Sequence, residues 1–547
     1  MNSQERRNTS LTLSLLLVVF TVTPLPVRFG ELQTSHLIVS APSVERDDAI
    51  TEPYNETYRP QFHFTPAINW MNDPNGPIYY EGEYHLFYQY NPFGNEWGHM
   101  SWGHAVSPDL VRWKHLPVAL SEENGVTIFS GSTVVDWHNT SGFCRGSSKE
   151  AVSCLVAIYT GNSSRLQTQN LAYSNDKGRT WTKYAENPVI DLHLAGFRDP
   201  KVFWHECTHK WVMVTALGSQ HRLKLFGSTD LKHWVALSEF GPAGATGGAW
   251  ECPDLFSLPV DGDASQTKWV LGVNVNPGGV AGGSGNQYFV GSFDGATFSS
   301  ETPAGRILWA DYGADFYAST SFSDMPKSDG RRIWLGWLSN WKYGARVPTD
   351  PWRGAQSIPR ELKLKRFADG IRLVQEPVIE LRMLRQQHTR VENRSIEAAN
   401  NLLKAKGVRG EMLEIVAEIA PGGASEFGLK VRKGDGEETV IGVDTNKLTL
   451  FVDRTRSGNV RFDEHFPSRD EGPITLGARK SVRLHIFIDR SSVEVFGNDG
   501  ETIISELIFP KRGSDQIELY SQGGQDSQGG QARVLKMDVW NLKSVYQ

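Results

Sequence analysis

Short apolar runs rich in aromatic residues alternate with polar turns over residues 58–365. Each run has the length of a β-strand, and no long segment shows the period of an amphipathic helix. A more polar pair of strand-like segments follows each run, so the pattern recurs roughly every 55–70 residues. The apolar runs lie at 84–90, 154–160, 268–275 and 331–341, with two further runs, KVFW and KWVMVTA, across 201–216. A repeating four-stranded unit predicts a β-propeller, here with room for five blades, and a large β-sandwich is the alternative.

The strand-like alternation resumes after a charged stretch at 366–385, which we interpret as a linker. Residues 386–547 contain further alternating runs, separated by turn signals such as Asn498-Asp499-Gly500. This pattern predicts a second all-β module, most simply a sandwich. The predicted fold is therefore all-β, with a five-bladed β-propeller at 58–365 followed by a C-terminal β-sandwich. The second module is interpreted either as a buttress for the propeller or as a contact surface for glycan.

The N-terminal region has the pattern of an export signal. Arg6 and Arg7 precede an apolar run from Leu11 to Val22, which is too short to span a bilayer. We expect a signal peptide at 1–30, a polar linker at 31–57, and a protein secreted to the extracellular space or periplasm. An uncleaved signal that anchors the chain is the alternative.

Composition narrows the classes of partner. The formal net charge is −6, and the chain has no long basic run, so a nucleic-acid partner is not expected. No other stretch is apolar and long enough to suggest a membrane partner. The chain contains 17 Trp, 16 Tyr and 26 Phe, residues that build cores but whose ring faces also stack on sugars. Among four cysteines, Cys144 and Cys154 flank a polar segment that a disulfide would close in an oxidising compartment.

Three acidic residues have unusual neighbours: Asp73 in NWMNDPNG, Asp199 in GFRDPKVFW and Glu251 in GGAWECPDLF. Turn chemistry alone explains the first stretch, and Asp-Pro is a common start of a turn. We expect Glu251, between Trp and Cys, to lie among apolar groups that raise its pKa, as a general acid requires. We expect Asp73 to stay ionised, supported by turn N–H groups and by Asn72. Two carboxyl groups with opposite roles are what glycoside hydrolysis needs.

Two other chemistries receive less support from the sequence. No cluster of His and acidic residues with metal-ligand spacing accompanies the three acids, and no G-x-S-x-G stretch occurs. We therefore expect neither a metal nor a cofactor.

The stretches WMNDPNG, FRDP and WECPD, in this order, resemble glycoside hydrolase family 32, the β-fructofuranosidases. IFSGS at 128–132, SIPREL at 357–362 and DRSSVEVFGNDG at 489–500 resemble further segments of that family. The resemblance implies a five-bladed propeller followed by a sandwich. It also implies that Asp73 is the nucleophile, Glu251 the acid/base and Asp199 the transition-state stabiliser. The residues implied to line the fructose pocket are Asn72, Gln89, Trp97, Phe129, Ser130, Arg198 and Trp341.

Segment 269–295 is most similar to microbial levanases and exo-inulinases. The resemblance implies a secreted retaining exo-fructosidase that removes terminal β-D-fructofuranosyl units from levan, and also from inulin and sucrose. An invertase with sucrose as its main substrate and a fructosyltransferase are alternatives within the same class. A catalytically silent fructan-binding protein is the alternative from a different class. Thr133 departs from the family, in which many members have Ala after Ser-Gly-Ser.

Overall fold

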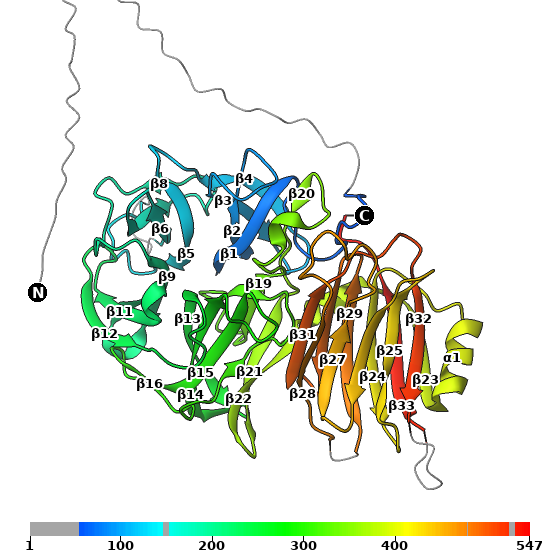
Figure 1. The fold of residues 1–547 in the computed structure, drawn as a ribbon. Coiled ribbons are helices and arrows are strands. Elements are labelled where there is room, and N and C mark those ends of the chain that lie inside the picture. The colour runs from blue at the N-terminus through cyan, green and yellow to red at the C-terminus, as the bar shows by residue number, and fades with distance from the viewer. Residues whose placement is uncertain (1–53, 146–152, 478–479, 524–530, 547) are drawn as a thin grey trace, which may run out of the picture. The chain divides into compact units, whose positions relative to one another are not determined.

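The computed structural model describes residues 54–145, 153–477, 480–523 and 531–546. The expected signal peptide and all but the last residues of the expected 31–57 linker lie outside this part of the chain. Antiparallel sheets dominate the described residues (Figure 1). The one α-helix found there, α1, spans Ile396–Ala405, and no helix of the described segments has the length and apolar character to cross a membrane.

The N-terminal part consists of consecutive antiparallel sheets (Figure 1). The first contains β1 (Asn69–Tyr80), β2 (Glu83–Tyr90), β3 (Ser101–Ser107) and β4 (Lys114–Leu120), with β20 (Trp352–Arg353) beside β1. The second contains β5 (Thr127–Val135), β6 (Leu155–Asn162), β7 (Gln167–Ser174) and β8 (Thr182–Lys183). The third contains β9 (Phe197–His205), β10 (Lys210–Leu217), β11 (Arg222–Ser228) and β12 (Val235–Phe240).

Two further sheets complete this part and are joined by one parallel pairing, between Val260 and Leu364. One contains β13 (Ala249–Val260), β14 (Asp263–Asn276), β15 (Gly285–Phe293) and β16 (Phe298–Ser300), with β17 (Leu308–Trp309) beside β15. The other contains β18 (Tyr317–Ser321), β19 (Arg332–Trp337), β21 (Arg360–Phe367) and β22 (Gly370–Pro377). Short 3-10 helices η1 (Glu206–Thr208), η2 (Gly218–Gln220) and η3 (Gly344–Arg346) lie in the connections.

The first strand of each sheet lies innermost. Among the described residues, β1, β5, β9, β13 and β18 contact one another in succession, and β18 contacts β1, which closes the ring. Apolar side chains fill the space between neighbouring sheets, as where Val156 and Met213 share one buried cluster. The predicted propeller is confirmed, and its inner strands all begin at the same mouth of the ring.

The charged stretch at 366–385 is not the linker that we expected. Residues 370–377 form β22, which pairs with β21 along its whole length, and η4 (Ile379–Leu384) follows. The stretch looked like a linker because its short buried run, Leu373 to Gln375, is flanked by the charged residues Arg372 and Glu376.

The C-terminal part is the predicted sandwich of two antiparallel sheets. One sheet contains β23 (Arg385–Ser395), β24 (Leu413–Ala420), β29 (Val482–Asp489), β30 (Ser492–Gly497), β31 (Thr502–Leu507) and β33 (Arg533–Leu542). The other contains β25 (Glu426–Lys433), β26 (Thr439–Asp444), β27 (Thr449–Asp453), β28 (Arg469–Pro473) and β32 (Gln516–Gln522). Aliphatic residues of both inner faces form one core. Ser395 caps α1 by accepting a hydrogen bond from the Ala398 amide (3.2 Å).

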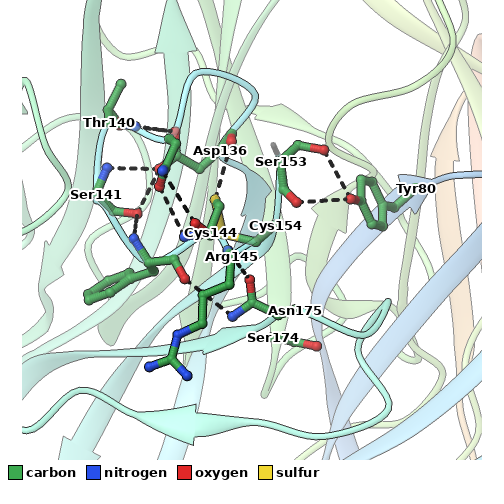
Figure 2. The surroundings of a disulfide bond; sticks show 12 residues. Tyr80, Asp136, Thr140, Ser141, Cys144, Arg145, Ser153, Cys154, Ser174 and Asn175 are labelled. Atoms are coloured by element: carbon green, nitrogen blue, oxygen red, sulfur yellow. Dashed lines mark hydrogen bonds between the residues drawn. A yellow bond between two sulfur atoms is a disulfide. The ribbon is translucent and has the colours of Figure 1, made fainter. Parts of the chain in front are cut away.

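A disulfide joins Cys144 and Cys154, as the sequence suggested (Figure 2). It ties the loop after β5 to the start of β6. Asp136 organises the same loop, because its carboxylate accepts hydrogen bonds from the backbone amides of Thr140 and Ser141, each at 2.8 Å. Residues 136–145 are therefore held both by Asp136 and by the disulfide.

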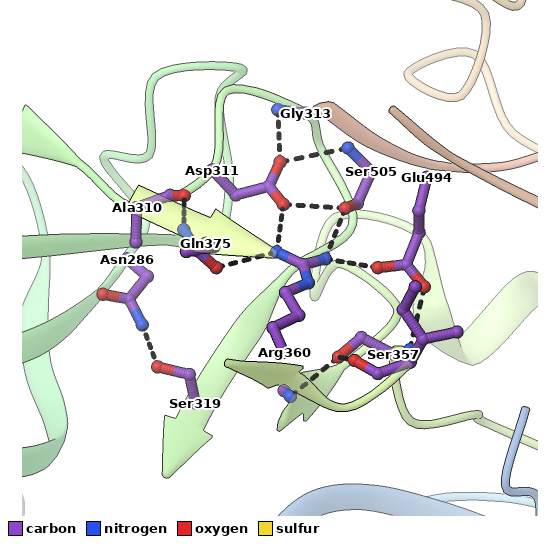
Figure 3. Close-up of polar contacts among 12 residues, drawn as sticks. Asn286, Ala310, Asp311, Gly313, Ser319, Ser357, Arg360, Gln375, Glu494 and Ser505 are labelled. Atoms are coloured by element: carbon purple, nitrogen blue, oxygen red, sulfur yellow. Dashed lines mark hydrogen bonds and ion pairs between the residues drawn. The ribbon is translucent and has the colours of Figure 1, made fainter. Parts of the chain in front are cut away.

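Buried ion pairs connect the sandwich to the propeller (Figure 3). Arg360 of β21 is fully buried and donates to Asp311 Oδ2 (2.9 Å) and Ser505 Oγ (2.7 Å), and it also pairs with Glu494. His63, just before β1, lies between Asp489 (2.8 Å) and Glu494 (2.9 Å). The stretches SIPREL and DRSSVEVFGNDG thus contribute residues to this joint.

We predict that the protein loses stability in alkaline solution, because His63 is then deprotonated. Burial alone would lower the pKa of His63, but Asp489 and Glu494 outweigh it and raise the pKa to about 9. A raised folded-state pKa stabilises the fold fully below about pH 6.5, and that contribution is lost as the pH rises through about 9. We expect the parent to lose on the order of 3 kcal/mol more than His63→Gln between pH 7 and 10, measured by urea unfolding. If the free energy of unfolding depended on pH in the same way in both proteins, His63 would not cause the alkaline loss of stability.

Candidate active site

The five inner strands share one irregularity near their first residues. In each strand two residues face a single residue of the neighbouring strand, which is a β-bulge. The bulged pairs are Asn72-Asp73, Phe129-Ser130, Asp199-Pro200, Cys252-Pro253 and Ala318-Ser319. Bulges re-aim side chains, and all five lie at the same mouth of the ring. Residues far apart in sequence are thereby brought to one place.

The stretch NWMNDPNG is not the tight turn that its composition suggested. It forms the first eight residues of β1, and its Asn, Pro and Gly residues serve two register shifts within the strand. Gly76 has φ +45°, and a Cβ there would lie 2.3 Å from Thr133 Oγ1, so only glycine fits. A bulged strand, and not a turn, therefore holds Asp73.

Asp73 is buried at the bottom of the site and accepts three hydrogen bonds. The donors are the Asn72 amide (3.0 Å), the Ser130 hydroxyl (2.8 Å) and the Cys252 thiol (3.5 Å). The Trp70 indole donates to Asn72 Oδ1 (2.7 Å), which turns the Asn72 amide nitrogen towards Asp73. Burial raises the pKa of Asp73 above its ordinary value; the Asn72 hydrogen bond opposes this shift, and the charge of Glu251 adds to it. The carboxylate is therefore aimed, but it is less well solvated than we expected.

Asp199 lies beside Asp73 in a strained backbone conformation. Its φ is +62°, and the φ of Cys252, in the equivalent bulge of β13, is +43°. Both values are uncommon for residues with side chains, and the two residues lie in equivalent bulges at the pocket. The Cys252 amide donates to Asp199 Oδ2 (2.9 Å). Burial raises the pKa of Asp199 to about 7, opposed by Arg198 and reinforced by Glu251.

Glu251 does not lie among apolar groups, contrary to our expectation. Trp250 points into the core, whereas the Glu251 side chain is 22% exposed and faces the pocket. Its carboxylate accepts a hydrogen bond from Arg198 Nη2 (2.8 Å) and another from the Tyr317 hydroxyl. Neighbours in a strand point to opposite sides, so the aromatic residue next to Glu251 in sequence is not its neighbour in space. Solvent reaches Glu251, while Asp73 is only 9% exposed.

A pocket of about 260 Å³ brings all ten predicted site residues together. Asp73, Asp199 and Glu251 line it with Asn72, Gln89, Trp97, Phe129, Ser130, Arg198 and Trp341. Trp97 is half exposed at the rim, and Trp341 stacks on buried Trp70. Gln89 is anchored by donating to the Ile128 carbonyl (3.0 Å).

Three residues of the site were missed by the sequence reasoning. Tyr317 and Asn276 line the pocket, and the Cys252 thiol contacts Asp73. Tyr317 precedes the bulge of β18 as Glu251 precedes that of β13 and Arg198 that of β9. Aligning the inner strands on this position would have found it. No group of three or more possible metal ligands occurs in the described segments.

We predict that the ionised Asp199 carboxylate lowers the stability of the fold. Its folded-state pKa of about 7 exceeds the ordinary 3.8, so its contribution to stability falls as the pH rises from about 4 to about 7. Above pH 7 the ionised carboxylate costs free energy. We expect the free energy of unfolding of Asp199→Asn to exceed that of the parent by about 1–3 kcal/mol at pH 8. Near pH 4 we expect no such difference. An equal difference at both pH values, measured by denaturant titration, would contradict this account.

The three carboxylates differ in surroundings although they share one pocket. One is buried and held by three donors, one is open to solvent, and the third lies beside an arginine. Hydrolysis of a glycosidic bond needs carboxyl groups in distinct roles, set within aromatic walls that contact a sugar ring. The fold and this pocket thus define a glycoside hydrolase.

Comparison with known proteins specifies the class. The model of the glycosyl hydrolases family 32 N-terminal domain matches residues 63–377, and that of the family 32 C-terminal domain matches residues 380–541. The chain belongs to glycosyl hydrolases family 32.

Individual relatives are similar over nearly all of the described chain. A levanase of Bacillus subtilis (strain 168) is 55% identical, over 91% of this chain and 72% of the relative. An extracellular exo-inulinase of Aspergillus ficuum is 43% identical, over 90% of this chain and 96% of the relative. The crystal structure of an exo-inulinase from Aspergillus awamori superposes with a TM-score of 0.82 at 39% identity, covering 90% of this chain and 100% of that one.

Proposed function

We propose that this protein is a secreted retaining exo-fructosidase that releases terminal β-D-fructofuranosyl units from levan, and also from inulin and sucrose. The observation that carries the proposal is the pocket in which Asp73, Asp199 and Glu251 converge. The similarity to a levanase and to exo-inulinases supports fructan as the substrate class. The relatives described as extracellular support secretion.

The shape of the pocket favours attack at chain ends. Its volume of about 260 Å³ lies below the ~300–1,000 Å³ typical of sites for drug-sized ligands. A cavity of only about 20 Å³ lies beneath it, lined by Pro74, Asp199, Cys252 and neighbouring residues. A polymer therefore cannot pass through, and one terminal sugar residue fills the site.

The proposed chemistry is a double displacement. Asp73 attacks the anomeric C2 of the bound fructosyl unit while Glu251 gives its proton to the departing glycosidic oxygen. The fructosyl unit is then held as an ester of Asp73, and the shortened chain leaves. Glu251 next takes a proton from water, which attacks C2, breaks the ester and regenerates both carboxyl groups. Exposure of Glu251 to the pocket mouth suits this exchange with water.

The other residues hold the substrate and the acids. Asp199, fixed by the Cys252 amide, accepts hydrogen bonds from fructose hydroxyl groups as positive charge builds on the ring. Arg198 and Tyr317 donate to Glu251 and set its direction. Trp97, Phe129 and Trp341 supply apolar walls for the sugar. The C-terminal module acts as a buttress, consistent with its buried ion pairs to the propeller.

Product analysis tests the proposal. The purified protein is incubated separately with levan, inulin and sucrose, and the products are separated by chromatography. Fructose as the sole early product from levan is the expected result. Short fructans would indicate internal cleavage, longer fructans a fructosyltransferase, and activity confined to sucrose an invertase. Binding of levan without any product would indicate a fructan-binding protein.

A further inference from the structure

A second cavity, of about 490 Å³, lies at the opposite end of the inner strands. Each inner strand starts at the candidate active site, and three of them end at this cavity or just before it. Phe129 of β5 lines the first pocket and Val135 the second, while Asp199 and Trp204 have the same relation in β9. A rise of about 3.3 Å per residue places Trp204 roughly 17 Å beyond Asp199 along β9.

The two cavities are not connected by a passage for substrate. The space between them holds about 20 Å³, which is room for roughly one water molecule. The Lys201 side chain crosses this region, where it pairs with Asp254 (3.5 Å) and donates to the Ser321 carbonyl (2.6 Å). A molecule in the second cavity must therefore enter from the opposite face of the propeller.

Tryptophan rings dominate the wall of the second cavity. Trp137 is 48% exposed, and its indole N–H donates to Asp324 Oδ1 (2.8 Å). The Trp204 indole N–H donates to Glu206 (3.2 Å). Because the ring nitrogens are occupied by these carboxylates, both rings are held in place and present apolar faces to a ligand.

The polar groups of this cavity suit an uncharged ligand. Arg332 and Lys327 are balanced by Asp324 and Glu206 on the same wall. Among the described residues, the Arg332 guanidinium makes one hydrogen bond, to the Phe322 carbonyl (3.1 Å), which leaves other N–H groups available. Fixed aromatic faces beside planar charged groups are also the lining of the candidate active site, where Trp97, Trp341 and Arg198 occur.

Residues 136–145, the part of the loop that carries Trp137, are held in position before any ligand binds. They are the residues that Asp136 and the Cys144–Cys154 disulfide tie down (Figure 2). A site whose walls are already ordered loses little conformational entropy on binding.

We propose that this cavity is a second fructan-binding site, which holds one chain end or branch of a polymer while the catalytic pocket acts on another chain end. The inference rests on the proposed function. Because the channel is closed, the end or branch bound here belongs to another part of the same polymer or to a neighbouring chain. Such anchoring raises the local concentration of chain ends for levan, but it does nothing for sucrose.

Steady-state kinetics with levan and sucrose test the second site. For Trp137→Ala we expect KM for high-molecular-mass levan to rise roughly 3- to 10-fold, with kcat on both substrates and KM for sucrose unchanged. Ser257→Phe, which fills the cavity without removing a tryptophan, should have the same effect. Val235→Ala, an exposed change on β12, serves as the control. An unchanged KM for levan in both cavity variants would overturn the proposal.

A binding measurement separates this proposal from the proposed function. Asp73→Asn and Asp73→Asn/Trp137→Ala are run in native gels that contain levan or, as a control, dextran. We expect levan to retard the single variant, and the retardation to weaken in the double variant. Equal retardation of both would refute the second site even if the parent hydrolyses levan. Loss of retardation in the double variant would support it even if the parent proves inactive.

Discussion

Asp73→Asn is expected to lower kcat on levan by roughly four orders of magnitude, with the fold intact. Asn retains the shape of the side chain, and its Oδ1 can still accept from the Asn72 amide while its NH2 group donates to the Ser130 hydroxyl oxygen, but it cannot form the ester with C2. The pKa of Asp73 is raised chiefly by burial, so removal of its charge should not destabilise the protein. Initial rates of fructose release and a thermal unfolding curve measure both effects.

The same substitution at an exposed aspartate serves as the control for this test. Asp263 is the exposed first residue of β14 and accepts hydrogen bonds only from nearby residues of that strand in the described structure. Asp263→Asn should therefore keep the parent rate. If Asp73→Asn retained more than about one hundredth of the parent kcat, Asp73 would not be the nucleophile.

Glu251→Gln should show an effect that depends on the leaving group. On levan, loss of proton transfer is expected to lower kcat by about 10²–10⁴-fold. An aryl β-fructofuranoside needs no proton to depart, so formation of the ester should stay fast, while its hydrolysis, which needs the base, becomes slow. A rapid burst of phenol followed by a slow steady state is the expected trace.

A control variant and a comparison of the two substrates distinguish proton transfer by Glu251 from a positioning role. Glu239→Gln, on the exposed strand β12, should behave as the parent on both substrates. Equal losses on levan and on the aryl fructoside, without a burst, would indicate that Glu251 only positions groups.

The inner-strand pattern shows why the sequence could predict the fold class. Aromatic and aliphatic runs of strand length, such as KWVMVTA, mark inner and middle strands directly, because both faces of those strands are buried. Strand β22 was missed because its buried run is only three residues long and has charged neighbours, so that its composition resembles that of a linker.

For the candidate active site, the sequence predicted the residues but not their surroundings. The motifs supplied the three acids and the pocket-lining residues, all of which the structure brings into one cavity. Their environments could not be predicted, because side chains that are adjacent in sequence point to opposite faces. Glu251 meets Arg198 and Tyr317 instead of its neighbour Trp250, and Asp73 is held by a bulged strand instead of a turn. Such contacts arise from sequence separations of 50 residues or more.

The central claim is that Asp73 carries a fructosyl ester, and its direct test is mass spectrometry of the trapped enzyme. Glu251→Gln is mixed with an aryl β-fructofuranoside, quenched in acid during the slow phase and digested. We predict that the peptide containing Asp73 gains the mass of one anhydrofructose unit, and that fragmentation places it on that carboxyl group. An unmodified Asp73 peptide during a demonstrated burst, or an adduct on Asp199, would contradict the mechanism.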